Sequence, residues 1–402
     1  MRTRWLALAC GALLLTGCGS VSSLGAAISA AARQAAPVTA TGGCPAGSVF
    51  FPYSADALTG IQFVSPARGW AVGLDTILAT TDGGRRWTVQ RSGQLNLTSV
   101  DFISGQVGWA VGNSTLLATS DGGVHWAALP EPCPVIRSVH FISPETGFAV
   151  AGGSNVLDPG AVTPEIAGVV LATSDGGRSW RRLTTPADAQ SVCFSNPKDG
   201  WLGAGGRLYR TTEGGQGWTR VTAGTQASVG GYPAMMIVQC AGAGSAWALE
   251  VGAGATMSKQ PNLGYHADPA GAVPVFAEQY FPHPGVRVAA DSPGSYPGPF
   301  SAISPSAAVY LGWCPACAGT ATAPTAPWDL VTGSGALLTP EGTVPGLDQP
   351  VAASFLSPQI GWVVGIVISD NGPGRVRQQQ RIVFTDDGGR TWHVQYAGPP
   401  AS

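Results

Sequence analysis

The chain has 402 residues, with 21 lysines and arginines against 23 aspartates and glutamates, and a formal net charge of −2 at pH 7. Only 11% of its residues are charged, and no long basic stretch interrupts the sequence. Proteins that bind nucleic acid need a clustered basic face to neutralise phosphates, so this composition excludes a nucleic-acid partner.

Residues 1–17 have the features of a bacterial export signal. Two arginines precede an apolar run at 5–15 that is too short to span a membrane. The run leads into a Leu-Thr-Gly-Cys sequence ending at Cys18, which resembles the lipobox in which the cysteine is acylated. We therefore expect lipidation of Cys18, an Ala/Ser-rich tether over 18–43, and a lipid-anchored location on the extracytoplasmic face of the bacterial cell membrane. An ordinary signal peptide with an incidental cysteine is the alternative.

A short pattern, Thr-x-Asp-x-Gly-x-x-Trp, recurs five times at intervals of tens of residues, once with Glu in place of Asp. The hydroxyl and the carboxylate can accept bonds from backbone N–H groups of a tight turn, and the glycine permits positive φ. The tryptophan then starts the next strand and supplies apolar surface. We predict that these residues build turns. They are Thr80, Asp82, Gly84, Trp87, Thr119, Asp121, Gly123, Trp126, Thr173, Asp175, Gly177, Trp180, Thr211, Glu213, Gly215, Trp218, Thr385, Asp387, Gly389 and Trp392.

Two further signatures are phased with this box: an apolar strand that ends near a Phe, and a Gly-aromatic strand. Together they define a unit of four short strands, which is one propeller blade. Two more units, at 236–249 and 300–312, keep the first two strands without a box. We predict an all-β fold, a single seven-bladed propeller of four-stranded antiparallel blades over 58–397, preceded by an N-terminal segment at 44–57. In the second unit the strands are expected at 99–103, 109–111, 116–119 and 126–129.

Six cysteines remain once Cys10 and Cys18 in the export segment are set aside, and an even number in an exported chain favours disulfides. One pair falls on the innermost strands of consecutive blades, one would attach the N-terminal segment to the ring, and one forms a Cys-x-x-Cys loop. For the loop pair, redox activity or metal binding is the alternative to a structural disulfide. The pairs are Cys193 with Cys240, Cys44 with Cys133, and Cys314 with Cys317.

A partner-binding face is expected where the loops between the second and third strands emerge, because four blades carry insertions there, at 152–166, 251–272, 313–327 and 366–380. Residues that open the innermost strands would ring the channel mouth on that face. Arg137 could pair with a ligand carboxylate or with Glu131. The candidates are Asn96, Arg137, Gln190 and Tyr232.

The Gly-Trp-Ala-Val-Gly strands and their phased boxes resemble the Asp-box propellers, also called bacterial neuraminidase repeats. The resemblance is strongest to the photosystem II stability/assembly factor-like family and covers about 58–396, weakening between 221 and 348. It implies a non-enzymatic propeller that binds other proteins during assembly of membrane complexes. We therefore expect a monomeric envelope propeller that binds a protein or peptide partner as a receptor or assembly factor.

Two other functions stay open. Asp boxes also occur in sialidases, so the chain could be a sialidase-like glycoside hydrolase or a carbohydrate-binding propeller; it could also be a structural envelope component without a ligand. The box carboxylates lie one per blade, and the innermost strands carry hardly any acid except Asp101. No histidine has metal-ligand spacing. We therefore expect no catalytic residues, no metal and no cofactor.

Overall fold

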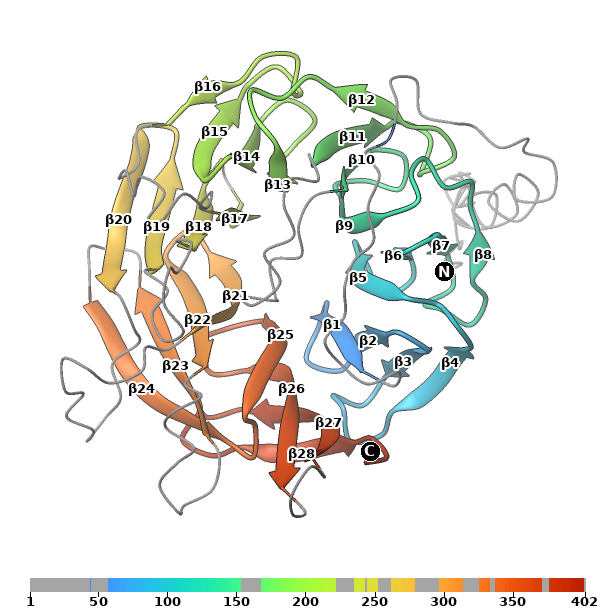
Figure 1. Cartoon of the computed structure of the whole chain (residues 1–402), viewed down its shortest axis with the longest axis vertical. Helices are drawn as coiled ribbons and strands as arrows, with labels where there is room; N and C mark the ends of the chain where they lie inside the picture. Colours follow the sequence, from blue (N-terminus) through green and yellow to red (C-terminus); the bar gives the residue numbers. More distant parts are fainter. Residues whose placement is uncertain are drawn as a thin grey trace, which may run out of the picture.

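The computed structural model describes residues 44, 57–152, 168–221, 235–242, 244–251, 262–278, 296–313, 325–332, 337–370 and 376–400. These residues form seven four-stranded antiparallel sheets arranged around a ring (Figure 1). No helix long and apolar enough to cross a membrane occurs in this described part. The predicted all-β, seven-bladed propeller is confirmed.

Each blade consists of four strands that are consecutive in the chain and run from the channel outward. Blades one to three contain β1 (Leu58–Phe63), β2 (Gly69–Gly73), β3 (Thr76–Thr80), β4 (Thr88–Ser92); β5 (Leu97–Phe102), β6 (Gly108–Gly112), β7 (Thr115–Thr119), β8 (Ala127–Ala128); and β9 (Ile136–Phe141), β10 (Gly147–Ala151), β11 (Val169–Thr173), β12 (Arg181–Leu183). Blade four contains β13 (Ala189–Phe194), β14 (Gly200–Ala204), β15 (Arg207–Thr211) and β16 (Thr219–Arg220).

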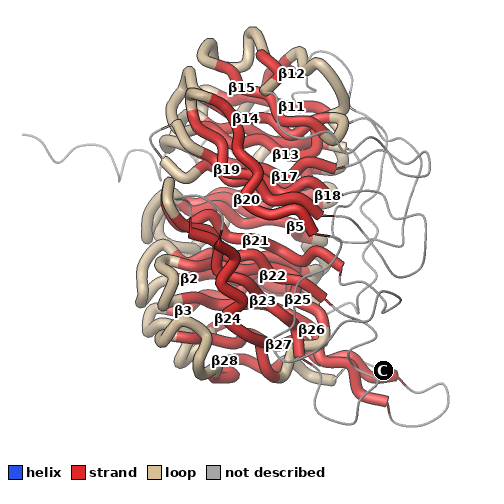
Figure 2. Tube along the Cα trace, turned by 90° about the vertical axis from the view of Figure 1, so that its left-hand side faces the viewer, coloured by secondary structure: helices blue, strands red, loops and turns tan. Residues whose placement is uncertain are grey.

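Blades five to seven follow the same order. They contain β17 (Met235–Cys240), β18 (Ala246–Val251), β19 (Asn262–Asp268), β20 (Gly271–Glu278); β21 (Tyr296–Ser304), β22 (Ala307–Trp313), β23 (Thr325–Thr332), β24 (Leu337–Pro345); and β25 (Gln349–Phe355), β26 (Gly361–Asp370), β27 (Val376–Thr385), β28 (His393–Ala397). Because the strands are antiparallel, the described turns between the first and second strands and between the third and fourth strands lie at the same end of each sheet. Figure 2 shows these turns gathered on one side of the ring, which we call the box face.

The strand boundaries differ from the prediction by one or two residues in blade two and by more in blade seven. In blade two the outermost strand is only β8, two residues long, where four were expected at 126–129. In blade seven, much of the expected insertion at 366–380 continues β26 and β27, which pair from Gly361 opposite Thr385 out to Asp370 opposite Val376. The strands lengthen because the sequence between them is itself apolar and β-branched at 366–368.

A repeated aromatic sandwich forms the contact between most blades. The Phe102 ring of blade two stacks on Trp70 of blade one with centroids 3.5 Å apart, and meets Trp126 of its own box edge-on at 5.8 Å. A Cβ on Gly108 would overlap the Phe102 ring, so the residue before the strand aromatic has to be glycine. The sandwich therefore explains the phasing of the three sequence signatures, and it recurs at the Trp109–Phe141, Phe148–Phe194 and Trp362–Phe63 pairs.

Candidate functional site

The residues predicted at the channel mouth lie in different settings. Asn96 is exposed in a turn with φ of 48°. Arg137 donates to the carbonyls of Ala189 and Gln190 in the next blade, and burial lowers the pKa of Arg137 to about 10. Gln190 accepts the N–H of Met236 from blade five. Tyr232 lies outside the described residues. Arg137 and Gln190 therefore connect blades, and the proposed partner-binding role of this set stays a prediction.

A polar belt runs around the channel at the ends of the innermost strands. At each of the seven blade contacts, a side chain from one blade bonds the innermost strand of the next. The belt consists of Gln62, Asp101, His140, Cys193 with Cys240, Gln239, Ser301 and Ser354. Burial raises the pKa of Asp101, while nearby His140 and the bond from the Phe141 N–H oppose that shift. Asp101, the one acid expected on these strands, therefore joins blade two to blade three.

Two disulfides join parts of the chain that are distant in sequence. Cys193 bonds Cys240, which connects the innermost strands of blades four and five. Cys44 bonds Cys133, which attaches a residue of the N-terminal segment next to blade three. Cys314 and Cys317 lie outside the described residues. No group of three or more His, Cys, Asp or Glu side chains in the described part could hold a metal ion.

In four of the five boxes the aspartate accepts hydrogen bonds within its own turn. In blade seven, Oδ1 of Asp387 accepts the Thr385 hydroxyl and the N–H of Thr391, and Oδ2 accepts the Thr391 hydroxyl at 2.6 Å. The Thr385 hydroxyl oxygen in turn accepts the N–H of Gly389. Asp82, Asp121 and Asp175 repeat the same bonds to the backbone four residues on. These carboxylates hold the turns.

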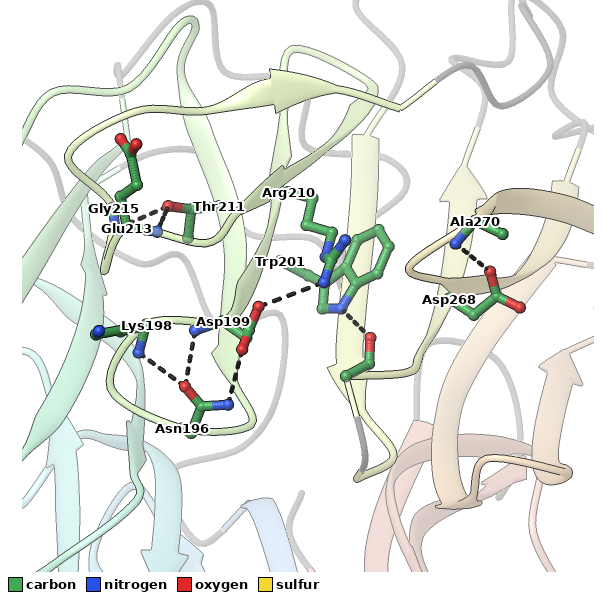
Figure 3. Close-up of polar contacts among 11 residues, drawn as sticks. Asn196, Lys198, Asp199, Trp201, Arg210, Thr211, Glu213, Gly215, Asp268 and Ala270 are labelled. Atoms are coloured by element: carbon green, nitrogen blue, oxygen red, sulfur yellow. Dashed lines mark hydrogen bonds and ion pairs between the residues drawn. The ribbon is translucent and has the colours of Figure 1, made fainter.

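The box of blade four differs in two positions that act on one carboxylate. Glu213 replaces the aspartate, and Gly217 occupies the position where Ser179 or Thr391 donates a hydroxyl in other boxes. Only the backbone N–H groups of Glu213 and Gly215 bond Thr211, as Figure 3 shows. The Glu213 side chain is exposed and makes no bond with the described residues. This carboxylate is therefore available to a ligand.

Glu213 lies between two clefts at the outer part of the box face. One of about 840 Å³ separates blades three and four, and another of about 870 Å³ separates blades four and five. Thr212 and Glu213 line both clefts, which together we call the blade-four groove. Hydroxyl, amide and charged side chains line it beside the box tryptophans Trp180 and Trp218.

Side-chain contacts hold the residues that line the groove. Arg210 bonds Asp199 at 3.3 Å and lies over the Trp201 ring at 5.7 Å (Figure 3). Across the second cleft, Oδ1 of Asp268 accepts the N–H groups of Ala270 and Gly271, which fixes the tip of a hairpin. A groove with preset walls loses little entropy when it binds a ligand.

From the sequence we grouped Glu213 with the turn-building carboxylates, and the groove was not predicted. The signal was present in the box itself, because both the acid and the residue four positions later depart from the other copies. The sequence alone could not show that Glu213 lines one groove together with Asp268 and Lys198. Asp268 belongs to the neighbouring blade and Lys198 to a separate turn.

Comparison with known proteins supports the fold and changes the expected function. A family model described as photosynthesis system II assembly factor YCF48 matches residues 49–132, which confirms the resemblance to Asp-box propellers. No curated protein matches the sequence. The GH74 enzyme of Niastella koreensis has a TM-score of 0.53 at 8% identity, over 88% of this chain and 67% of that one. An ancestral GH74 enzyme has a TM-score of 0.50 at 15% identity, over 86% and 55%.

These comparisons overturn the expectation of a non-catalytic propeller that binds an envelope protein or peptide. These two structural neighbours are glycoside hydrolases, which favours the carbohydrate alternative over that expectation. The same comparison contradicts the prediction that the chain is no enzyme. At 8% and 15% identity the likeness itself establishes the propeller fold. The chain spans about two thirds and just over half of the lengths of the two enzymes.

Proposed function

We propose that this protein is a carbohydrate-active propeller that binds a glycan chain in the blade-four groove. The observation that carries the proposal is the Glu213 carboxylate, released from its box at the junction of two polar clefts. The GH74 neighbours lend support, since they are propellers that act on glycosides. A free carboxylate accepts hydrogen bonds from sugar hydroxyls, and bonds to a charged group are stronger than neutral ones.

The shape and lining of the groove suit a sugar chain. The two clefts share Thr212 and Glu213, so an extended ligand can run from one into the other across blade four. Hydroxyls of Thr212 and Ser179 supply donors and acceptors, and Trp218 supplies an apolar wall. Sugars present both hydroxyl edges and apolar C–H faces, so a mixed lining of this kind matches them.

Hydrolysis of the bound glycan is favoured by one specific observation. Glu213 and Asp268 both line the cleft between blades four and five, on opposite sides of Arg210 and Trp201 (Figure 3). Glycoside hydrolysis commonly uses two carboxyl groups flanking the bond, one as general acid and the other as base or nucleophile. Asp268 keeps Oδ2 available because its two backbone bonds both go to Oδ1.

The decisive variant is Glu213→Asp, which restores the standard box. The shorter carboxylate is expected to accept the N–H of Gly217 and withdraw from the groove, so that glycan affinity falls about tenfold or more. Hydrolysis should fall by roughly 100-fold or more, the range of general acid–base catalysis. Thermal stability should stay equal or rise, since the turn gains a bond. The measurements are calorimetric binding and reducing-end release across a panel of soluble polysaccharides.

The matched control is Asp387→Glu in blade seven, which makes the reverse change in a box away from the groove. It should lower stability and leave glycan binding intact. The proposal is wrong if no polysaccharide of the panel binds the wild-type protein, or if Glu213→Asp binds as tightly as the wild type.

We also propose that the protein is exported and anchored to the extracytoplasmic face of the membrane through a lipid on Cys18. The Leu-Thr-Gly-Cys sequence and the even cysteine count support this, as disulfides persist outside the cytoplasm. Metabolic labelling with a radioactive fatty acid should mark the wild-type protein and leave Cys18→Ser unlabelled. Equal labelling of both would contradict the anchor.

A further inference from the structure

Three cationic side chains line the blade-four groove without a partner among the described residues. Arg181 and Lys198 belong to the cleft between blades three and four, and Arg220 belongs to the cleft between blades four and five. All three are exposed. Arg210, which also lines the groove, differs because Asp199 neutralises it. The groove therefore offers positive charge on both sides of Glu213.

The acids of the groove form no ion pairs with these cations. Asp268 accepts two N–H bonds from its own hairpin, and neither Asp268 nor Glu213 is within ion-pair distance of a cationic side chain in the described part of the chain. Closing a groove over a ligand removes water from the charges that line it, which is costly unless each charge meets an opposite one. A neutral glycan would leave Arg181, Lys198 and Arg220 uncompensated.

We infer that the glycan bound in the blade-four groove is acidic, with carboxylate or sulfate groups that pair with Arg181 and Lys198 on one side of Glu213 and with Arg220 on the other. This inference rests on the proposed carbohydrate function. Arginine binds planar carboxylates and tetrahedral sulfates through two N–H bonds at once, and lysine adds a point charge. Glu213 at the junction then faces a stretch of the chain between anionic groups, where like-charge repulsion is smallest.

Binding of three oligosaccharides of equal length tests the inference: an oligogalacturonate, a sulfated galactan fragment and a neutral malto-oligosaccharide. The wild-type protein should bind one or both acidic probes and bind the neutral probe at least tenfold more weakly. The carboxylated and sulfated arms identify which anion is read. Affinity for the acidic probe should fall several-fold between 50 and 300 mM NaCl, because exposed ion pairs are screened.

The variants Arg181→Gln, Lys198→Gln and Arg220→Gln should each weaken acidic-probe binding roughly two- to tenfold, and their combination by more than any single change. Arg86→Gln is the control, since this exposed arginine lies in the box of blade one, away from the groove. It should leave affinity unchanged.

The outcomes separate this inference from the proposed function. Equal binding of neutral and acidic probes, with no effect of the three variants, overturns the acidic specificity while the carbohydrate function stands. Failure of every glycan to bind overturns both. The acidic specificity of the groove is also overturned if Arg86→Gln weakens binding of the acidic probe as much as Arg181→Gln does. General surface charge would then explain the binding.

Discussion

At the scale of single residues, the box aspartates link the fold to pH. In blade seven the hydroxyl and the N–H of Thr391 bond the ionised carboxylate and hold the pKa of Asp387 at about 2. In blade one the N–H of Arg86 and the Thr80 hydroxyl lower the pKa of Asp82 in the same way. An unfolded aspartate titrates at about 3.9. Between these values the folded state binds fewer protons than the unfolded state.

Stability from these carboxylates is therefore complete above about pH 4 and is lost as the pH falls toward 2. We expect Asp387→Asn to lower the melting temperature at pH 7, and the gap between variant and wild type to narrow as the pH falls from 4 to 2.5. Melting curves over pH 2.5–7 measure it. The adjacent exposed Asp386→Asn serves as control, and a gap independent of pH would contradict the role assigned to Asp387.

The roles of single residues could be predicted where the box sequence repeats, and could not be predicted where one box departs from that repeat. The turn geometry of Thr385 and Asp387 follows from hydroxyl, carboxylate and glycine at fixed spacing, and the structure has those bonds. Glu213 obeys the same pattern in sequence, yet its extra methylene and the glycine at position 217 release its carboxylate. Recognising this requires the three-dimensional structure, in which the turn is held by the N–H groups of Glu213 and Gly215 on Thr211, and the Glu213 carboxylate bonds no described residue.

At the scale of the elements, the contact between blades four and five is built differently from those that contain an aromatic sandwich. Cys240 stands at the end of β17, where β1, β5, β9 and β13 each end in a phenylalanine that stacks on the preceding blade. Trp201 stacks on no aromatic ring of the described residues and donates its indole N–H to Gly244. The Cys193–Cys240 disulfide thus replaces an aromatic sandwich.

Replacing both cysteines by serine should destabilise the protein by about 3–4 kcal/mol, because the bond closes a loop with a separation of 47 residues. Blades four and five should loosen first. The measurement is chemical denaturation with hydrogen exchange on Met235–Cys240. The double serine variant of Cys44 and Cys133 is the comparison. If the Cys193 and Cys240 variant lost protection from hydrogen exchange only outside blades four and five, the role given to the Cys193–Cys240 disulfide would be contradicted.

Strand positions were predictable in proportion to the strength of the repeat. Boxes phased with Gly-aromatic strands located the first four blades and the seventh, because each signature fills a fixed place in the aromatic sandwich. Blades five and six, which lack boxes, were expected from two strands each and contain four. Their outer pairs, such as β23 with β24, carry no repeated turn residue that could have indicated them.

At the scale of the whole molecule, the ring closes without exchanging a strand. β1 to β4 form blade one and β25 to β28 form blade seven, so side chains alone join the two. Phe63 stacks on Trp362 at 3.5 Å, the Trp362 indole N–H reaches the Gly83 carbonyl and the Gln395 side chain, and the Phe63 N–H bonds Ser354. This seam repeats the contacts between blades that the chain connects directly.

We expect Trp362→Ala and Trp70→Ala to cost a similar free energy of unfolding, about 3–5 kcal/mol each, since both remove a buried stacked indole. They should differ in how the ring opens. Trp362→Ala should speed hydrogen exchange in β1 and β28, while Trp70→Ala should not. Equal exchange along the seam in both variants would show that the covalent connections between blades contribute no local restraint.

A ring whose seven sheets are each one continuous segment has no privileged starting point. Joining the end of β28 to the start of β1 with a short linker, and opening the chain between any two blades, would preserve every sheet and move only the seam. The same property lets a blade be duplicated or lost as one block of sequence. Circular permutation and blade shuffling are thus available to this architecture in a way that a strand-swapped closure would forbid.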